Sequence, residues 1–150
     1  MKKKSWFNTE YYRDFAVAVA IVTPDGLVMV KDNTKITPAW KHPGGKRDDF
    51  EDPEACAIRE VDEETGIKLR PGQLRRLYKE NRGNHDVYFF GVILTINPKV
   101  KDNGSDGEEV RIIPLGEIIE RPATIFEPHL RPIKVREFMG LSPVEKACLA

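Results

Sequence analysis

The chain of 150 residues has little cysteine, no excess of one charge and no long hydrophobic run. Its two cysteines, Cys56 and Cys148, fall in a predicted helix and near the C-terminal end, a placement that does not indicate a disulfide framework. The longest apolar run, residues 15–22, is too short to span a bilayer, and no apolar core of a signal peptide follows the basic start. We therefore expect a cytoplasmic protein with no membrane partner.

The balance of charge argues against another class of partner. Lysine and arginine number 24, and aspartate and glutamate also number 24, so no global field attracts nucleic acid and no specific nucleic-acid partner is expected. The composition does not exclude a basic patch on one part of the surface. The composition, 40% hydrophobic and 32% charged, is that of a soluble globular protein. A single domain over residues 1–150 is long enough to bury a core without disulfides.

Hydrophobic runs and turn residues predict a mixture of strands and helices. Residues 87–94 are almost continuously apolar, which is typical of a strand buried on both faces, with helices above and below its sheet. The pattern predicts a layered α/β or α+β domain. Strands are expected at residues 15–22, 27–31, 74–80, 85–96 and 110–115, a loop at 32–41, a helix at about 53–65, and short helices starting near 116 and spanning about 132–139.

The chain does contain a dense group of acidic side chains in residues 44–67. Asp52 can cap the predicted helix and Gly66 suits the left-handed position just past its end. The helix then carries three glutamates at i, i+3 and i+4, on one face: Glu60, Glu63 and Glu64.

These three carboxylates repel one another by roughly 0.2–0.5 kcal/mol per pair even when exposed. Arg59 can pair with Glu63 one turn away, but one arginine cannot neutralise three glutamates. A hard divalent cation can, because Mg²⁺ prefers oxygen ligands such as carboxylates. The alternative for the glutamates alone is a solvated acidic face, which most charge runs are.

The whole segment has a fixed spacing. Gly45 is followed after five residues by Glu51, and after seven more by Arg59, Glu60, an apolar residue, Asp62, two glutamates, Thr65, Gly66 and Ile67. This resembles the box of the Nudix hydrolase family at every fixed position. The resemblance implies the Nudix fold, an α/β/α sandwich around a mixed β-sheet. It also implies a hydrolase that cleaves the pyrophosphate linkage of a nucleoside diphosphate joined to another group.

The resemblance implies roles for particular residues. Glu60 and Glu64 are expected to be the main ligands of Mg²⁺ or Mn²⁺, with Glu63 binding directly or through water and the carbonyl of Gly44 as a further ligand. Arg59 and Glu51 are expected to pair and hold the glutamates in place. The predicted catalytic residues are therefore Glu51, Arg59 and Glu63.

Several alternatives stay open at this stage. The general base can be a glutamate of the box or one in a later loop, where Glu108 and Glu109 are candidates, with exposed loop acids as the plain alternative. A non-catalytic module that senses a nucleotide is the competing function, although such modules usually lose box glutamates. A small-molecule nucleotide is the expected partner, and a homodimer is left open.

The substrate is not identified by the sequence. The residues at 82–85 lack the proline or tyrosine that mark two substrate classes of the family. Aromatic residues that could stack a base, with ordinary packing as the alternative, are Trp40, Tyr88, Phe89 and Phe126; histidines that could contact phosphate are His42 and His129.

Overall fold

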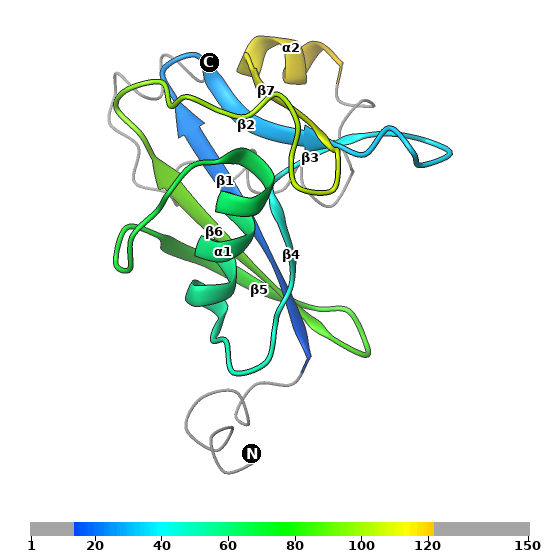
Figure 1. Cartoon of the computed structure of the whole chain (residues 1–150), viewed down its shortest axis with the longest axis vertical. Helices are drawn as coiled ribbons and strands as arrows, with labels where there is room; N and C mark the ends of the chain where they lie inside the picture. Colours follow the sequence, from blue (N-terminus) through cyan, green and yellow to red (C-terminus); the bar gives the residue numbers. More distant parts are fainter. Residues whose placement is uncertain (1–13, 122–150) are drawn as a thin grey trace.

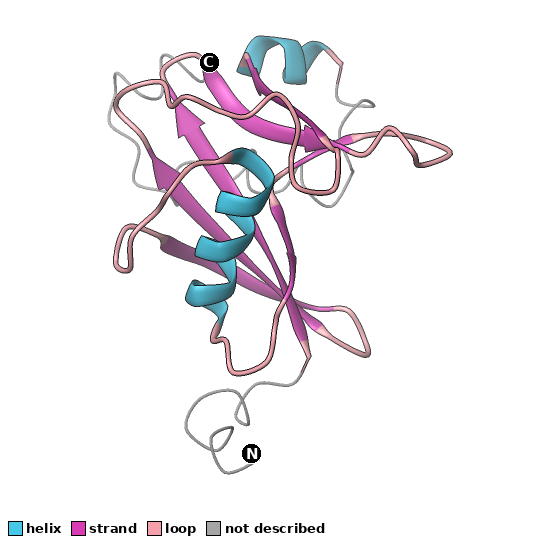
Figure 2. Cartoon of the chain, viewed as in Figure 1, coloured by secondary structure: helices cyan, strands magenta, loops and turns pink. Residues whose placement is uncertain are grey.

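The computed structural model describes residues 14–121, which form a mixed seven-stranded sheet with one helix on each face (Figures 1 and 2). The strand order is β3-β2-β1-β6-β5, with β4 beside β1 and β7 beside β2. The strands are β1 (Phe15–Thr23), β2 (Gly26–Lys31), β3 (Trp40–Lys41), β4 (Gly44–Lys46), β5 (Arg75–Asn81), β6 (Asp86–Ile93) and β7 (Glu109–Ile113). The helices are α1 (Pro53–Thr65) and α2 (Leu115–Glu120).

The two predicted strands β1 and β2 form an antiparallel hairpin but diverge away from its turn. Only the end of β1 pairs with the start of β2, in the register Ile21 to Val28 and Thr23 to Gly26. The segment 40–46 fills the gap, pairing with β2 through β3 and with β1 through β4. The sequence analysis assigned residues 32–41 to a loop and no strand to 44–46, and this was wrong for both short strands. They are stabilised by partners far away in sequence, so their own residues carry little signal.

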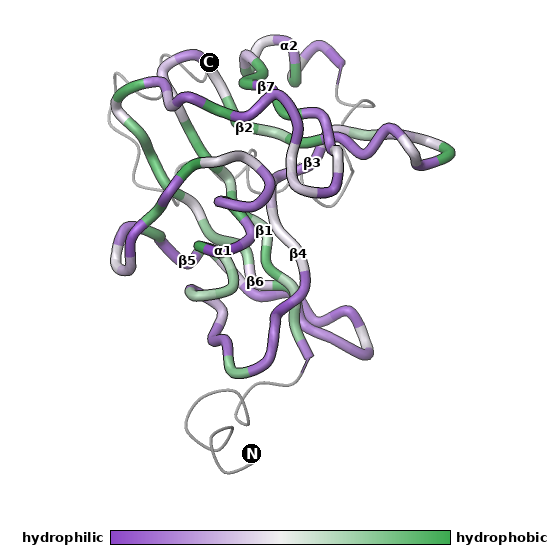
Figure 3. The backbone as a smooth tube through the Cα atoms, in the orientation of Figure 1, coloured by the Kyte–Doolittle hydropathy of each residue, from purple (hydrophilic) through white to green (hydrophobic). Residues whose placement is uncertain are grey.

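The buried core lies on both faces of β1 and β6, which pair in parallel. On one face, alternate residues of β1 such as Val17 and Val19 pack against Ala57 and Val61 of α1. On the other face, Ala20 and Val22 pack in a cluster with Leu115 and Ile118 of α2. Figure 3 shows the apolar character of β1 and the hydrophilic character of much of the loop that leads to α1. The predicted layering, with a helix on each face, is confirmed.

The helix α1 begins and ends where the sequence predicts. The Asp52 carboxylate accepts a hydrogen bond of 2.8 Å from the Ala55 N–H and so caps the first turn. Gly66 adopts the left-handed conformation with φ of 83°, and its N–H donates to the Asp62 carbonyl. Local residues determine both ends, so they could be predicted without the rest of the fold.

The remaining predictions are confirmed with adjusted ends. The strand expected at 85–96 ends at Ile93, and the last predicted strand and short helix are β7 and α2. The helix expected near 132–139 lies outside the described residues. No helix within residues 14–121 has the length and apolar character needed to cross a membrane.

Candidate active site

The acidic face of α1 lies against β4, the strand that contains the two glycines of the box. A Cβ atom at Gly44 would overlap the backbone of Val17, and one at Gly45 would displace the Glu60 carboxylate from its present position. The Gly44 N–H donates a hydrogen bond of 2.8 Å to Glu64 Oε1. The glycines therefore bring the backbone of β4 into direct contact with two of the three predicted glutamates.

Arg59 joins four carboxylates into a network, named here the Arg59 cluster. Its Nε lies 2.7 Å from Glu51 Oε2, and its Nη2 donates to Glu51 Oε1 at 3.0 Å, a bidentate pair. Its Nη1 reaches Glu60 Oε2 at 3.3 Å and Glu63 Oε1 at 3.2 Å. Asp48 is the fourth carboxylate, 3.2 Å from Nε. The pairing expected between Arg59 and Glu51 is present in this structure.

The Arg59 cluster shifts the pKa values of its members in different directions. Burial by itself would raise the pKa of Glu51, but the hydrogen bonds from Arg59 and from the Asp48 N–H outweigh it and the pKa is lowered. For Glu60 burial is the largest effect and Arg59 only partly offsets it, so the pKa is raised. The guanidinium is held by several carboxylates, which raises the pKa of Arg59. Arg59 therefore stabilises the ionised form of Glu51 more effectively than that of Glu60.

Glu64 lies outside the Arg59 cluster and is the most buried of the box glutamates, at 8% exposure. Burial raises its pKa from 4.5 to about 8, and the Gly44 N–H and Lys41 only partly oppose this shift, while Glu108 adds to it. A carboxylate so placed is costly to ionise unless a cation binds beside it.

Glu108 is brought to Glu64 by the loop that precedes β7. This loop binds the last turn of α1: the Ser105 N–H and Oγ both donate to the Glu63 carbonyl, at 3.0 and 2.8 Å, and the Lys101 N–H donates to the Thr65 carbonyl at 2.9 Å. Glu108 is 8% exposed, and its Oε1 is buried without a hydrogen-bond partner in the described part of the chain. Glu64 and Glu108 are named here the Glu64–Glu108 pair.

The structure separates the two loop glutamates that the sequence could not distinguish. Glu109 is the first residue of β7, where its Oε1 lies 3.8 Å from Lys31 Nζ and 3.1 Å from Asn33 Nδ2. Glu109 is therefore engaged by residues at the end of β2 and just after it, whereas Glu108 is close enough to Glu64 to raise its pKa. Glu108 directly precedes Glu109 at the start of β7, where the side chains of successive residues point in opposite directions.

The donor set suits a hard divalent cation. Within residues 14–121, no three His, Cys, Asp or Glu side chains converge closely enough to hold a metal ion. Glu60 and Glu63 are hydrogen-bonded by Arg59 instead. The buried Glu64 and the partnerless Oε1 of Glu108 are oxygen donors that a cation would satisfy, so the residues present fit the group.

The other candidate residues divide by environment. Trp40, Tyr88 and Phe89 are 7%, 4% and 1% exposed and are packed in the core, in agreement with the packing interpretation. His42 lines a cavity beside β4. Phe126 and His129 lie outside the described residues.

Comparisons with known proteins agree with this geometry. A family model described as the NUDIX domain matches residues 12–134. The chain is 49% identical over 79 residues to nucleoside diphosphate-linked moiety X motif 6 of Xenopus laevis, covering 48% of this chain and 36% of that protein. It is 32% identical over 76 residues to diphosphoinositol polyphosphate phosphohydrolase 3-alpha of Mus musculus, covering 50% of this chain and 45% of that protein.

A solved structure shows the same fold. The bifunctional NMN adenylyltransferase/ADP ribose pyrophosphatase of Francisella tularensis, complexed with AMP and a manganese ion, aligns with a TM-score of 0.66 over 89% of this chain and 44% of that chain. At 22% identity this likeness shows the fold alone. The matched segments cover less than half of the length of the two curated relatives named above.

Proposed function

Because this chain belongs to the NUDIX domain family, we propose that it is a metal-dependent hydrolase of the pyrophosphate linkage in nucleoside diphosphate derivatives. The observation that carries the proposal is the Glu64–Glu108 pair: two buried carboxyl groups close enough for the charge of Glu108 to raise the pKa of Glu64, one of them with an oxygen that has no partner in the described chain. A buried carboxyl group such as Glu64 is costly to ionise by itself, and a cation bound beside it would offset that cost.

In this proposal the residues divide into two roles. Glu64, Glu60 and Glu63, with the Gly44 carbonyl, would hold Mg²⁺ or Mn²⁺, the divalent metals that members of this family generally require. Once bound, the ion would neutralise phosphate charge and lower the pKa of the attacking water. Arg59 and Glu51 position Glu60 and Glu63 through the hydrogen bonds of the Arg59 cluster.

Glu108 is the preferred general base of the two loop glutamates. It lies beside Glu64 and has an Oε1 without a hydrogen-bond partner in the described chain, whereas Glu109 is engaged by Lys31 and Asn33. A base needs a free oxygen within reach of the water that attacks phosphorus. The water's proton would pass to Glu108 as the bond from phosphorus to the bridging oxygen breaks.

The experiment is a phosphate-release screen over nucleoside diphosphate derivatives, run with Mg²⁺, with Mn²⁺ and with a chelator. We expect turnover of at least one compound, abolished by chelation. Nucleotide binding without turnover under any metal would favour the sensing module instead.

We also propose a single functional domain over residues 1–150 in the cytoplasm. The proposal is supported by the one continuous sheet of residues 14–121 and by a buried Cys56 with no disulfide. Fractionation of tagged protein tests the compartment, and light scattering tests whether a homodimer forms.

A further inference from the structure

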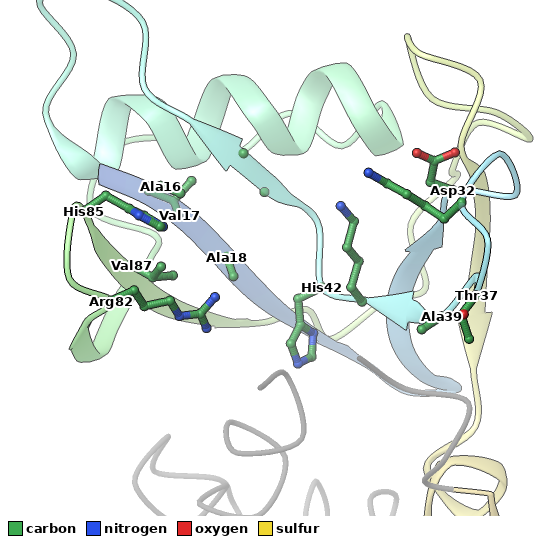
Figure 4. A pocket seen from close by; sticks show the side chains of 14 residues that line it. Ala16, Val17, Ala18, Asp32, Thr37, Ala39, His42, Arg82, His85 and Val87 are labelled. Carbon is green, nitrogen blue, oxygen red and sulfur yellow. The ribbon is translucent and has the colours of Figure 1, made fainter. Parts of the chain in front are cut away.

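A cavity of about 460 Å³ lies beside β4, on the face of the sheet away from α1 (Figure 4). Ala16 and Ala18 line it, and along β1 these residues alternate with Val17 and Val19, whose side chains pack in the α1 cluster. Figure 4 shows Arg82 and His85 at one end of the cavity and Asp32 at the other. The cavity is therefore built by β1, β4, the loop after β2 and the turn before β6.

Basic side chains outnumber acidic ones in the lining of this cavity, in a chain of no net charge. Among the described residues that line it, Lys35, Lys41 and Arg82 carry positive charge, and Asp32 is the one carboxylate. Asp32 is itself engaged: its Oδ1 accepts hydrogen bonds from the Thr34 N–H at 3.0 Å and from the Thr34 hydroxyl at 2.6 Å. Glu80 is a second carboxylate beside this group, because it pairs with Arg82, so three cations against two carboxylates leave an excess of one positive charge here within residues 14–121.

Arg82 contributes a donor that the described chain does not satisfy. Its Nε lies 2.8 Å from Glu80 Oε1, which fixes the guanidinium, while its Nη2 is buried and has no hydrogen-bond partner within residues 14–121. A buried N–H without an acceptor costs free energy, and a fixed guanidinium fork matches the oxygens of a phosphate group.

The cavity shares a wall with the acidic site. Gly44 and Gly45 line it, and the same two residues contact Glu64 and Glu60 on the other side of β4. A compound whose pyrophosphate lies at the glutamates would place its remaining part next to these glycines.

We propose that the cavity binds a phosphate group on the second moiety of the substrate, with Arg82 as its main contact, so that the protein prefers diphosphate compounds whose second moiety is itself phosphorylated. This rests on the proposed function, because one substrate is taken to occupy both sides of β4. Arg82 is then a specificity-determining residue.

The test is a binding measurement on protein treated with a chelator. The probe is inositol hexakisphosphate, which carries several phosphate monoesters but no pyrophosphate to cleave, with inorganic phosphate as the reference ligand. Calorimetry should show that wild type binds the probe more tightly than phosphate, and that the affinity falls as salt screens the charges. Arg82→Ala should weaken binding of the probe about 10–100-fold, the loss of one charge-assisted contact.

Lys68→Ala is the matched control, because Lys68 is paired with Asp62, its side chain is 80% exposed and it lies outside the lining of the cavity. It removes the same charge and should change the affinity less than about 2-fold. Arg82→Lys keeps the charge without the fork and should fall between the two. Thermal unfolding of each variant confirms that it is folded.

The inference is overturned if wild type binds the probe no more tightly than phosphate, or if Arg82→Ala and Lys68→Ala weaken binding equally. The metal-dependent release screen runs in parallel. Hydrolysis of diphosphate compounds without binding of the probe leaves the proposed function standing and overturns the inference. Probe binding that depends on Arg82 but comes without hydrolysis supports the phosphate site and overturns the function.

Discussion

The Arg59 cluster and the Glu64–Glu108 pair each contain one or more glutamates of α1, but their negative charge is compensated differently. In the cluster, one guanidinium reaches Glu51, Glu60 and Glu63 at 2.7 to 3.3 Å. In the pair, both residues are 8% exposed, and Glu64 receives only a backbone N–H at 2.8 Å. The cluster carries its own cation within the chain, whereas the pair has none in contact.

This difference indicates which residues position the site and which take part in its chemistry. A self-compensated network stabilises one geometry of the helix and the loop before it, because its hydrogen bonds satisfy the carboxylates. An uncompensated buried pair lowers the stability of the metal-free protein. Folded proteins keep such pairs where ligand binding offsets the loss of stability. We infer that the cluster fixes the site, that Glu64 contributes charge to bind the ion, and that Glu108 near it takes up the proton of the attacking water.

The largest effect is expected from Glu64→Gln, which removes charge from the uncompensated pair and keeps the size of the side chain. Turnover should fall roughly 10²–10³-fold, the scale for losing one preorganised charged group. Wild type should also gain about 2.7 kcal/mol of stability at a hundred-fold excess of metal over its Kd, and the variant should lose most of that gain. Equal shifts by Mg²⁺ and Mn²⁺ in thermal unfolding of both proteins would show that Glu64 is not a ligand.

The second prediction compares Glu108→Gln with Glu109→Gln. Loss of a general base should lower kcat about 10²-fold in the first variant, because only Glu108 lies beside Glu64. The second variant loses an exposed contact with Lys31 and should keep kcat within about 2-fold of wild type. Steady-state kinetics on one substrate decide between them, and the opposite ranking would assign the role to Glu109.

Arg59→Ala should have a smaller effect on turnover, about 10–100-fold, since Arg59 acts through Glu60 and Glu63. It should also lower the free energy of unfolding by about 1–3 kcal/mol, because half-buried carboxylates lose their partner. Arg59→Lys keeps the charge without the bidentate fork and should recover only part of both losses. Turnover at the wild-type level in Arg59→Ala would show that Arg59 does not position Glu60 and Glu63 for the reaction.

The sequence predicted the parts of this site that depend on local residues. The helix α1, its cap Asp52 and its end at Gly66 follow from short-range rules, and the pairing of Arg59 with Glu51 follows from the resemblance of the box. The strands β3 and β4 could not be predicted, because two or three residues become a strand only when β1 and β2 diverge around them.

Two further features depend on the tertiary fold. Glu108 and Glu109 are adjacent in sequence, and only the docking of the loop onto the end of α1 places one of them beside Glu64. The cavity beside β4 brings together Lys35, Lys41 and Arg82 from separate segments, and their spacing in the sequence does not predict that they lie in one cavity. The local basic face that the neutral composition left open is therefore a finding of the structure.

The smallest expected effect is on stability against pH in chelator-treated protein, where the two groups should act in opposite directions. Glu51 has a lowered pKa, so its contribution is present above its ordinary value of 4.5 and is lost as the pH falls below it. Glu64 has a pKa raised from 4.5 to about 8, so its contribution is full below pH 4.5 and is lost as the pH rises toward 8.

Urea unfolding of wild type between pH 5 and 8.5 should therefore show a loss of about 1–2 kcal/mol that is absent in Glu64→Gln. One group can contribute at most about 1.4 kcal/mol per pH unit, and water entry reduces that ceiling. Because histidines titrate in the same range, the difference between the two proteins is the quantity to measure, and it isolates the Glu64 carboxylate. Saturating Mg²⁺ should remove the difference in slope, since a bound cation keeps Glu64 ionised across the range. Parallel curves for the two metal-free proteins would mean that Glu64 is ionised at neutral pH without a cation, and the contrast between the cluster and the pair would then fail.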